Sequence, residues 1–239
     1  MSDAGGLPRR VDLRAPDEPS EPAQVALLIS VAQLVCFPTD TVYGIGGTAS
    51  ERTARAIVAA KGRDEGKPLQ VVYPDRDALL GDGPFRRRTT EALLRLLPGP
   101  FTVLLPYPDH LSFPPPGTVT WDEPGGGTRD VQTYGVRVPR WPAGAAALAG
   151  LPYRLIASSA NPSGGRDPAS LDDVDPGLLA ACDLVLDAGP VPGIASTVID
   201  LSAYDDTGRW RILREGATGA DEVAALLAGE RPAAPGRGG

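Results

Sequence analysis

The segment from Lys61 to Leu69 holds three cations within seven residues, at the end of a predicted helix and directly before an apolar run. Two glycines separate Lys61, Arg63 and Lys67, and glycine lets a ligand approach the backbone closely. Arginine offers a planar fork to phosphate oxygens, and lysine offers a point charge. A cation that complements a helix C-terminus would explain Lys61 but not the other two. The spacing therefore favours a site for a phosphorylated ligand.

Several common kinds of active site are excluded by the residue types. The sequence contains no Walker P-loop and no Gly-x-Ser-x-Gly nucleophile elbow. His110 is the only histidine, and its Pro-rich surroundings indicate a surface residue. Cys36 and Cys182 lie in apolar runs, where buried free thiols are expected. Catalysis is therefore expected to come from orientation and charge neutralisation, without a covalent intermediate.

Small polar residues lie beside three apolar runs. The first run breaks at Pro38 into Thr39–Tyr43, the second leads into Ser158–Gly164, and the third is preceded by Gly193 and the hydroxyls of Ser196 and Thr197. Such groups can orient a phosphate or an α-carboxylate. The alternative is an ordinary turn, which composition alone favours for Ser158–Gly164.

Arg137 lies inside the apolar run Tyr134–Val138, where a buried charge needs a partner from the protein or from a ligand. Arg214 ends another apolar run. It is either a second charge that needs a partner or an exposed residue. Together with the cations and hydroxyls above, these residues indicate one cleft for an anionic nucleotide and a small polar substrate.

The chain has 239 residues, 42% of them hydrophobic, and a formal net charge of −7. This acidity argues against a protein that mainly grips a nucleic-acid backbone, although a local basic pocket remains possible. No apolar run reaches the length of a membrane span and no signal peptide opens the chain, so we expect a soluble, cytoplasmic protein. Residues 1–21 and 230–239 are expected to be disordered tails around one domain at 22–229.

Predicted helices and strands, which must position these groups, alternate irregularly along the chain. Apolar spacing predicts helices over 22–33, 51–60, 75–80, 86–97, 143–148, 176–181 and 220–227, with Ser50 as an N-cap and Gly62 as a helix end. Short apolar runs predict strands over 34–37, 69–73, 101–105, 134–138, 154–157, 183–187, 197–201 and 209–213, the last two as a hairpin with a turn at 205–208. Residues 107–130 are expected to form a long irregular loop. The pattern predicts an α/β domain around a twisted mixed sheet.

Seven blocks of this sequence resemble, in the same order, the YrdC-like threonylcarbamoyl-AMP synthases. They are Phe37–Gly44, Lys61–Arg63 with Lys67–Leu69, Pro98–Thr102, Gly135–Pro139, Ser159–Asn161, Ser196–Val198 and Leu213–Gly216. The resemblance runs from about Val25 to Leu227. It implies a single α/β domain with a twisted mixed sheet, flanking helices and a basic concave cleft, and a chain of this length has room for only that domain. It also implies condensation of L-threonine, bicarbonate and ATP into threonylcarbamoyl-AMP and pyrophosphate.

The resemblance assigns roles to residues of this chain. Lys61, Arg63, Ser159 and Asn161 are the expected catalytic residues. The expected ATP ligands are Arg63, Lys67, Thr133, Ser159, Asn161 and Arg214. The expected threonine ligands are Thr41, Arg137 and Ser196. Mg²⁺ would enter with ATP and need no protein side chain, and the product would pass to a separate tRNA threonylcarbamoyl transferase complex, with tRNA binding by this chain itself in doubt.

Four positions depart from the pattern that the resemblance leads us to expect. Val72 stands in place of a histidine near threonine, Ser158 in place of a proline, Ala195 in place of a glutamate, and Asp167 in place of a serine near the nucleotide. These changes leave open whether threonine is the acceptor. Two alternatives are a carbamoyl-adenylate-forming relative with altered acceptor specificity and a double-stranded RNA-binding module of the same fold.

Overall fold

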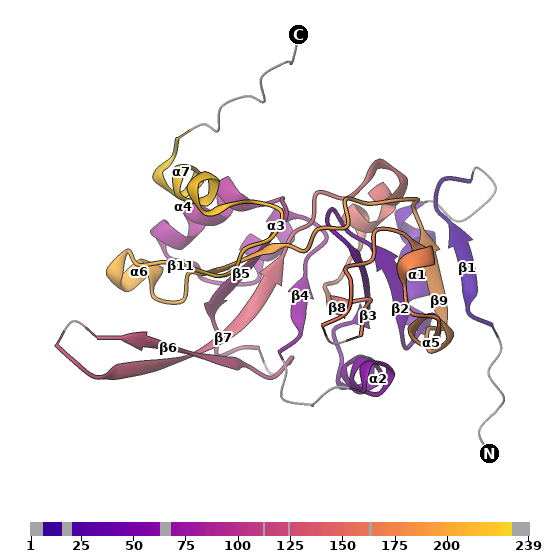
Figure 1. Ribbon diagram of the computed structural model, residues 1–239, viewed down its shortest axis with the longest axis horizontal. Helices are drawn as coiled ribbons and strands as arrows, with labels where there is room; N and C mark the ends of the chain where they lie inside the picture. Colours follow the sequence, from indigo (N-terminus) through magenta and orange to yellow (C-terminus); the bar gives the residue numbers. More distant parts are fainter. Residues whose placement is uncertain are drawn as a thin grey trace, which may run out of the picture.

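One twisted mixed sheet runs through the computed structural model, which describes residues 7–15, 21–62, 68–111, 113–123, 125–162 and 164–230 (Figure 1). In sheet order the strands are β1 (Arg9–Asp12), β9 (Leu184–Asp187), β2 (Val35–Pro38), β3 (Tyr43–Thr48), β8 (Leu155–Ser159), β4 (Gln70–Val72), β7 (Thr128–Arg137), β5 (Phe101–Pro106), β10 (Thr197–Asp200) and β11 (Arg211–Arg214), and β6 (Gly117–Asp122) pairs with β7. The pairs β1–β9, β9–β2, β4–β7 and β5–β10 are parallel and the others antiparallel. The predicted α/β class with a mixed sheet is confirmed.

Helices flank this sheet. They are α1 (Pro22–Val31), α2 (Glu51–Lys61), α3 (Arg76–Gly81), α4 (Arg87–Leu96), α5 (Pro176–Ala180), α6 (Tyr204–Thr207) and α7 (Ala220–Ala228), with short 3-10 segments at Ala143–Gly150 and Leu171–Asp173. The predicted ends of α2 are confirmed: the Ser50 hydroxyl accepts a hydrogen bond from the Thr53 N–H, and Gly62 adopts φ 55°. Within the described ranges, none of the helices has both the length and the apolar character needed to cross a bilayer.

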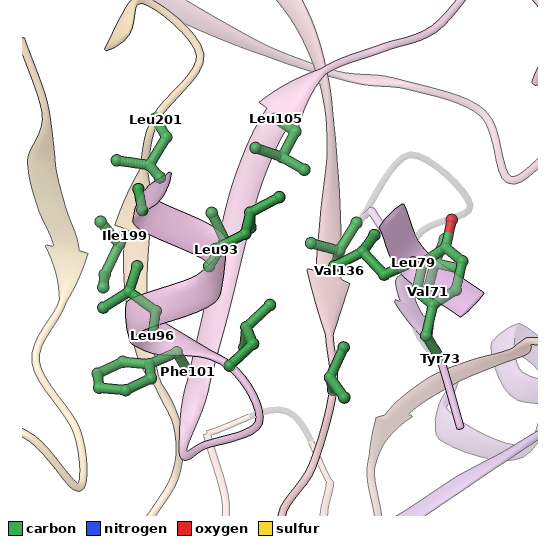
Figure 2. Close-up of a cluster of buried hydrophobic side chains, with 14 of the residues drawn as sticks. Val71, Tyr73, Leu79, Leu93, Leu96, Phe101, Leu105, Val136, Ile199 and Leu201 are labelled. Atoms are coloured by element: carbon green, nitrogen blue, oxygen red, sulfur yellow. The ribbon is translucent and has the colours of Figure 1, made fainter. Parts of the chain in front are cut away.

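Three apolar clusters hold the helices on the sheet, and strand alternation decides which cluster each side chain joins. α3, α4 and α7 pack on β4, β5, β7 and β10, as Figure 2 shows for Leu79, Leu93 and Val136. α2 and α5 pack on Cys36 of β2 and on its neighbours, while α1 packs against Phe37 from the opposite face. Since Val136 faces the first cluster, Arg137 points to the other face of the sheet. The cavity described below lies on that face.

The prediction of a disordered segment over 1–21 is wrong for part of that range. Arg9–Asp12 form β1 at the edge of the sheet, parallel to β9. Val11 is fully buried, and Arg10 donates to Asp187 at 2.6 Å. A polar, Pro-rich composition hid a short strand that gains most of its hydrogen bonds from a partner far along the chain. Residues 1–6, 16–20 and 231–239 lie outside the described residues.

The Asp187 carboxylate that holds β1 should make stability depend on pH. Burial opposes its ionisation, but hydrogen bonds from Arg10 and the Gly189 N–H, with the charge of Arg14, hold the pKa of Asp187 below its ordinary value. A lowered pKa stabilises the fold above the unfolded-state pKa of about 4, and this stabilisation disappears as the pH falls through the folded-state value. We expect Asp187→Asn to cost about 1 kcal/mol at pH 7, because Arg10 is largely exposed.

Urea unfolding of the wild type and the Asp187→Asn variant at pH 7 and pH 3 measures this effect. The difference in unfolding free energy should shrink on acidification, since the unfolded-state carboxylate is then protonated and the lowered pKa of the folded state contributes less. An equal difference at the two pH values would contradict an ionic contribution.

Two further segments differ from the sequence-based expectation. Residues 107–130 were expected to be irregular, whereas β6 and the first half of β7 form a hairpin that projects from the sheet (Figure 1). Trp121 of β6 is 4% exposed, and the Arg209 and Arg211 guanidinium groups lie 5.0 and 4.0 Å from its ring centre. The predicted hairpin of β10 and β11 is confirmed, but the connecting turn contains the one-turn helix α6.

The glycine-rich segment after Pro38 also forms a strand, which the sequence did not predict. Tyr43–Thr48 is β3, paired with both β2 and β8. Gly46 lies so close to β8 that a Cβ atom there would come within 2.0 Å of the Ile156 carbonyl oxygen. Glycine is therefore required at this position by the packing of the two strands.

Candidate active site

A cavity of about 200 Å³ opens on the face of the sheet to which Arg137 points. Its described walls come from β4, β7 and β8, from the turn after β2 and from the segment before β10. The lining residues are Thr39, Val42, Gly44, Pro68, Gln70, Val72, Arg137, Ala157, Ser158, Ser159, Asp167, Ala195, Ser196 and Arg214. A second cavity of about 510 Å³ adjoins it and shares Ser158, Ser159, Asp167, Ala195 and Arg214. We call these the small and the large cavity.

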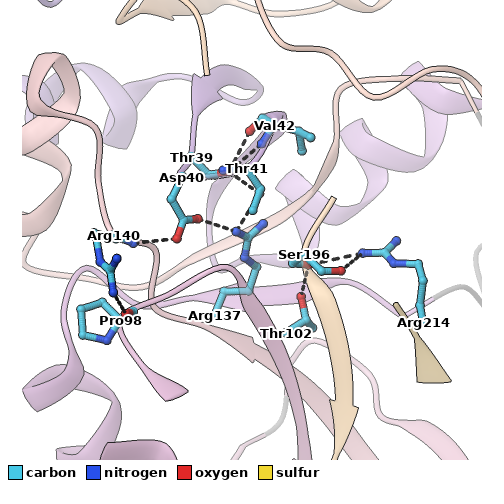
Figure 3. Close-up of polar contacts among 10 residues, drawn as sticks. All are labelled: Thr39, Asp40, Thr41, Val42, Pro98, Thr102, Arg137, Arg140, Ser196 and Arg214. Atoms are coloured by element: carbon cyan, nitrogen blue, oxygen red, sulfur yellow. Dashed lines mark hydrogen bonds and ion pairs between the residues drawn. The ribbon is translucent and has the colours of Figure 1, made fainter. Parts of the chain in front are cut away.

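Arg137 is the most deeply buried cation on the described wall of the small cavity. Its Nη2 donates to the Asp40 carboxylate at 2.8 Å and to the Thr41 hydroxyl at 2.9 Å (Figure 3). Burial lowers the pKa of Arg137 and the charge of Asp40 opposes this shift; the guanidinium stays protonated. Its Nε is buried without a hydrogen-bond partner. The protein thus supplies a carboxylate partner for the buried charge, and in the described residues the buried Nε has no partner.

The turn after β2 divides its hydroxyl groups between two roles. Thr39 lines the small cavity, whereas Thr41 is fully buried and shares a 3.0 Å hydrogen bond with Thr39. The Thr41 hydroxyl is directed to Arg137 and Thr41 is not among the residues that line the small cavity, and its expected contact with threonine stays a prediction. Tyr43 points away, and its hydroxyl donates to the Gly189 carbonyl.

Ser196 and Arg214 lie together at the mouth of the small cavity. The Ser196 and Thr102 hydroxyl groups are 2.7 Å apart, and the Arg214 Nη2 donates to the Ser196 carbonyl at 2.8 Å (Figure 3). Arg214 lines both cavities. Arg214 is exposed, as one of the two sequence interpretations expected, and its contact with Ser196 holds it beside both cavities.

The large cavity is lined by Lys61 and by three of the expected ATP ligands, which are Ser159, Asn161 and Arg214. Lys61 donates to the Ser159 carbonyl at 2.7 Å, and the Ser159 hydroxyl donates to the Asn161 side-chain oxygen at 2.6 Å. Thr133 is 2% exposed and lies outside the lining of both cavities, and its expected nucleotide contact stays a prediction. Arg63 and Lys67 lie outside the described residues.

The sequence reasoning missed two members of this site. Asp40 is the counter-charge of Arg137, and the signal that could have identified it was the need of a buried arginine for a carboxylate. Thr102 was hidden inside an apolar strand, and only its pairing with Ser196 places it at the site.

A family model described as "Telomere recombination", for the Sua5, YciO and YrdC proteins, matches residues 28–216. The chain belongs to this family. Every described residue that lines the two cavities falls within the matched range, so the Sua5/YciO/YrdC domain contains the whole candidate site.

Named relatives agree with this membership. The chain is 32% identical over 210 residues to the threonylcarbamoyl-AMP synthase of Bacillus subtilis and 32% identical over 206 residues to that of Pyrococcus abyssi. These alignments cover 86% and 83% of this chain but only 56% and 55% of the relatives, so the chain spans about half of their length. A putative threonylcarbamoyl-AMP synthase of Mycobacterium tuberculosis is 31% identical, with 83% of this chain and 85% of that protein covered.

Solved structures show the same Sua5/YciO/YrdC fold. P. abyssi Sua5 complexed with L-threonine matches with a TM-score of 0.70 and 26% identity, over 95% of this chain and 62% of that one. Escherichia coli YciO matches with a TM-score of 0.62 over 89% and 96% of the two chains, and at 18% identity it supports the fold alone.

Proposed function

We propose that this protein is an L-threonylcarbamoyladenylate synthase, a nucleotidyltransferase that condenses L-threonine, bicarbonate and ATP into threonylcarbamoyl-AMP and pyrophosphate. The observation that carries the proposal is Arg137, a buried guanidinium with an unpartnered Nε on the wall of a cavity of amino-acid size. A carboxylate is the group that such a donor binds best. The names of the relatives and the L-threonine bound to P. abyssi Sua5 support the same assignment.

The proposed reaction consists of two steps that need proximity and charge neutralisation. The neutral amine of the amino acid attacks bicarbonate, a C–N bond forms, and water leaves. An oxygen of the resulting carbamate then attacks the α-phosphorus of ATP, and the bond to the pyrophosphate leaving group breaks. The amino acid would lie in the small cavity, with Arg137 on its carboxylate and Ser196 beside it. The nucleotide would lie in the large cavity, where Lys61, Asn161 and Arg214 can contact anionic groups.

Mg²⁺ is part of this proposal, bound together with the triphosphate. In the described ranges, no group of three or more His, Cys, Asp or Glu side chains is arranged to hold a metal ion. Mg²⁺ that enters with phosphate oxygens needs only one or two protein ligands. The oxygens of Ser159 and Asn161 at the large cavity fit that requirement. The bound ion would neutralise charge that develops on the leaving pyrophosphate.

The proposal also includes the fate of the product. Threonylcarbamoyl-AMP is a reactive mixed anhydride, so a separate transferase must consume it, and we propose the complex that forms threonylcarbamoyladenosine in tRNA, in the cytoplasm. We assign no tRNA-binding role to this chain.

The test is a pyrophosphate-release assay with the purified protein, MgATP, bicarbonate and L-threonine. Pyrophosphate should form only when all of these are present, because the carbamate needs both an amine and bicarbonate. Omission of each component in turn is the control. Release that does not change when threonine is omitted would contradict the threonine assignment, and salt-sensitive RNA binding without ATP turnover would favour the RNA-binding alternative.

A carbamoyl-adenylate-forming enzyme with another acceptor is the second candidate. Val72 is paired with Arg137 in the register of β4 and β7, and it places an apolar side chain on the cavity wall, as does Ala195. A wall of this kind contacts an aliphatic side chain as readily as a hydroxyl-bearing one. The same assay with each amino acid in turn separates the two candidates, and a rate with valine above that with threonine would favour the second.

A further inference from the structure

Asp167 is the only carboxylate among the described lining residues of the small cavity, and it also lines the large one. The cations on the described wall of the small cavity are Arg137 and Arg214. A negative charge in a site proposed for anionic ligands needs a specific reason, since it would repel both a carboxylate and phosphates.

The backbone around Asp167 is held in place on both sides. The Pro168 carbonyl accepts from the Tyr43 N–H at 3.0 Å, and the Ala169 carbonyl accepts from the Val191 N–H at 2.7 Å. The Asp167 Oδ2 itself accepts from the Ala195 N–H at 3.1 Å. These contacts join the segment to the turn after β2 and to the segment before β10. The carboxylate is therefore fixed at the junction of the two cavities.

Among the described residues, the acceptor capacity of this carboxylate is largely unused. An ionised carboxylate has about four lone-pair sites. Besides the Ala195 N–H, the contact recorded for Asp167 is a 3.5 Å approach of the Asn161 Nδ2, which is at the limit of hydrogen-bond length. Over the described residues, Asp167 forms no ion pair with a lysine or arginine. A half-buried carboxylate that has acceptor positions left and no cationic partner in the described residues is suited to bind a cationic donor from a ligand.

We propose that Asp167 receives the α-ammonium group of the amino-acid substrate while Arg137 receives its carboxylate. This inference rests on the proposed function. A zwitterion presents one group of each sign, and the described wall of the small cavity presents Asp167 for the ammonium group and Arg137 for the carboxylate. Together, Asp167 and Arg137 would also bind the amino acid more tightly than the hydroxy acid that carries a hydroxyl in place of the amine. That selection suits the reaction, because the amine nitrogen is the atom that becomes the carbamate.

The test compares two ligands and two proteins by calorimetric titration in the presence of a non-hydrolysable ATP analogue. The ligands are L-threonine and 2,3-dihydroxybutanoate of matched stereochemistry, which carries a hydroxyl in place of the amine. Wild type should bind threonine about 10- to 100-fold more tightly than the hydroxy acid, the range expected for a charged hydrogen bond. Asp167→Asn should lose most of that discrimination, because its amide oxygen can keep the Ala195 contact but carries no charge.

Asp172→Asn is the matched control, since it makes the same change at an exposed aspartate nearby, and it should leave both affinities unchanged. Thermal unfolding shows whether each variant is folded. Equal affinity of wild type for the two ligands would overturn the inference without any variant. Unchanged threonine affinity in Asp167→Asn would overturn it too, and an altered Mg²⁺ requirement would then identify Asp167 as a metal ligand. Wild type that binds ATP but no amino acid would overturn the proposed function as well.

Discussion

Arg137→Met is expected to abolish threonine-dependent pyrophosphate release and to destabilise the protein by about 3–5 kcal/mol. The loss of activity follows from removal of the buried guanidinium group of a residue that lines the small cavity. The loss of stability has a separate cause: Asp40, whose side chain is 9% exposed, would remain charged in the interior without its partner. Both effects are measured on one preparation, by product assay and by urea unfolding.

A second variant separates the two effects. The double variant Asp40→Asn/Arg137→Met removes both charges of this buried pair, and the asparagine oxygen can still accept from the Arg140 N–H. We expect most of the stability to return while activity stays absent. Arg55→Met, which breaks an exposed pair with Glu51 on α2, is the matched control and should cost about 0.5 kcal/mol or less. An active Arg137→Met protein would remove Arg137 from substrate binding.

Gly46→Ala is expected to destabilise the protein by about 3 kcal/mol or more, because the new methyl group would collide with the Ile156 carbonyl of β8. Backbone atoms cannot rotate away, so β3 and β8 would have to separate in the middle of the sheet. For a chain of this length the loss corresponds to a fall in Tm of about 6–12 °C. Differential scanning calorimetry measures it.

Gly81→Ala is the matched control for this substitution. Gly81 ends α3, and a Cβ atom there would meet nothing within 4 Å. The same change should leave the protein equally stable or stabilise it by about 0.4–1 kcal/mol, because alanine restricts the unfolded chain. A Tm for Gly46→Ala close to that of the wild type would show that the two strands can move apart at little cost.

Elements with strong local signals could be predicted from the sequence. α2 has an N-cap at Ser50 and a glycine end at Gly62, and both act as expected. β3 could not be predicted in this way, because Gly44, Gly46 and Gly47 lower the strand propensity of a segment whose pairing comes from β2 and β8. β6 does alternate between exposed threonines and a buried Trp121, but the Pro- and Gly-rich flanks obscured that pattern.

The residues of the site could be predicted from sequence motifs, but their contacts and arrangement in space could not. Arg137 was identified because a charge in an apolar strand needs a partner, and the structure provides Asp40 at 2.8 Å. The difference between Thr39 and Thr41 could not be read from sequence, because it depends on how the turn after β2 packs against β7. Thr133 illustrates the same limit, since its burial follows from the pairing of β6 with β7.

The hairpin of β6 and β7 has a consequence for association between molecules. In the described residues β6 pairs with β7 alone, so its other edge has no strand beside it. Two alternate carbonyl groups of β6 are occupied by side chains: Arg211 donates to Thr120 at 2.9 Å and Arg209 donates to Asp122 at 2.6 Å. An unpaired edge is a template on which strands of other molecules can add and aggregate. The two arginines that lie over Trp121 therefore also block this edge, and they protect a projecting hairpin from intermolecular β-pairing.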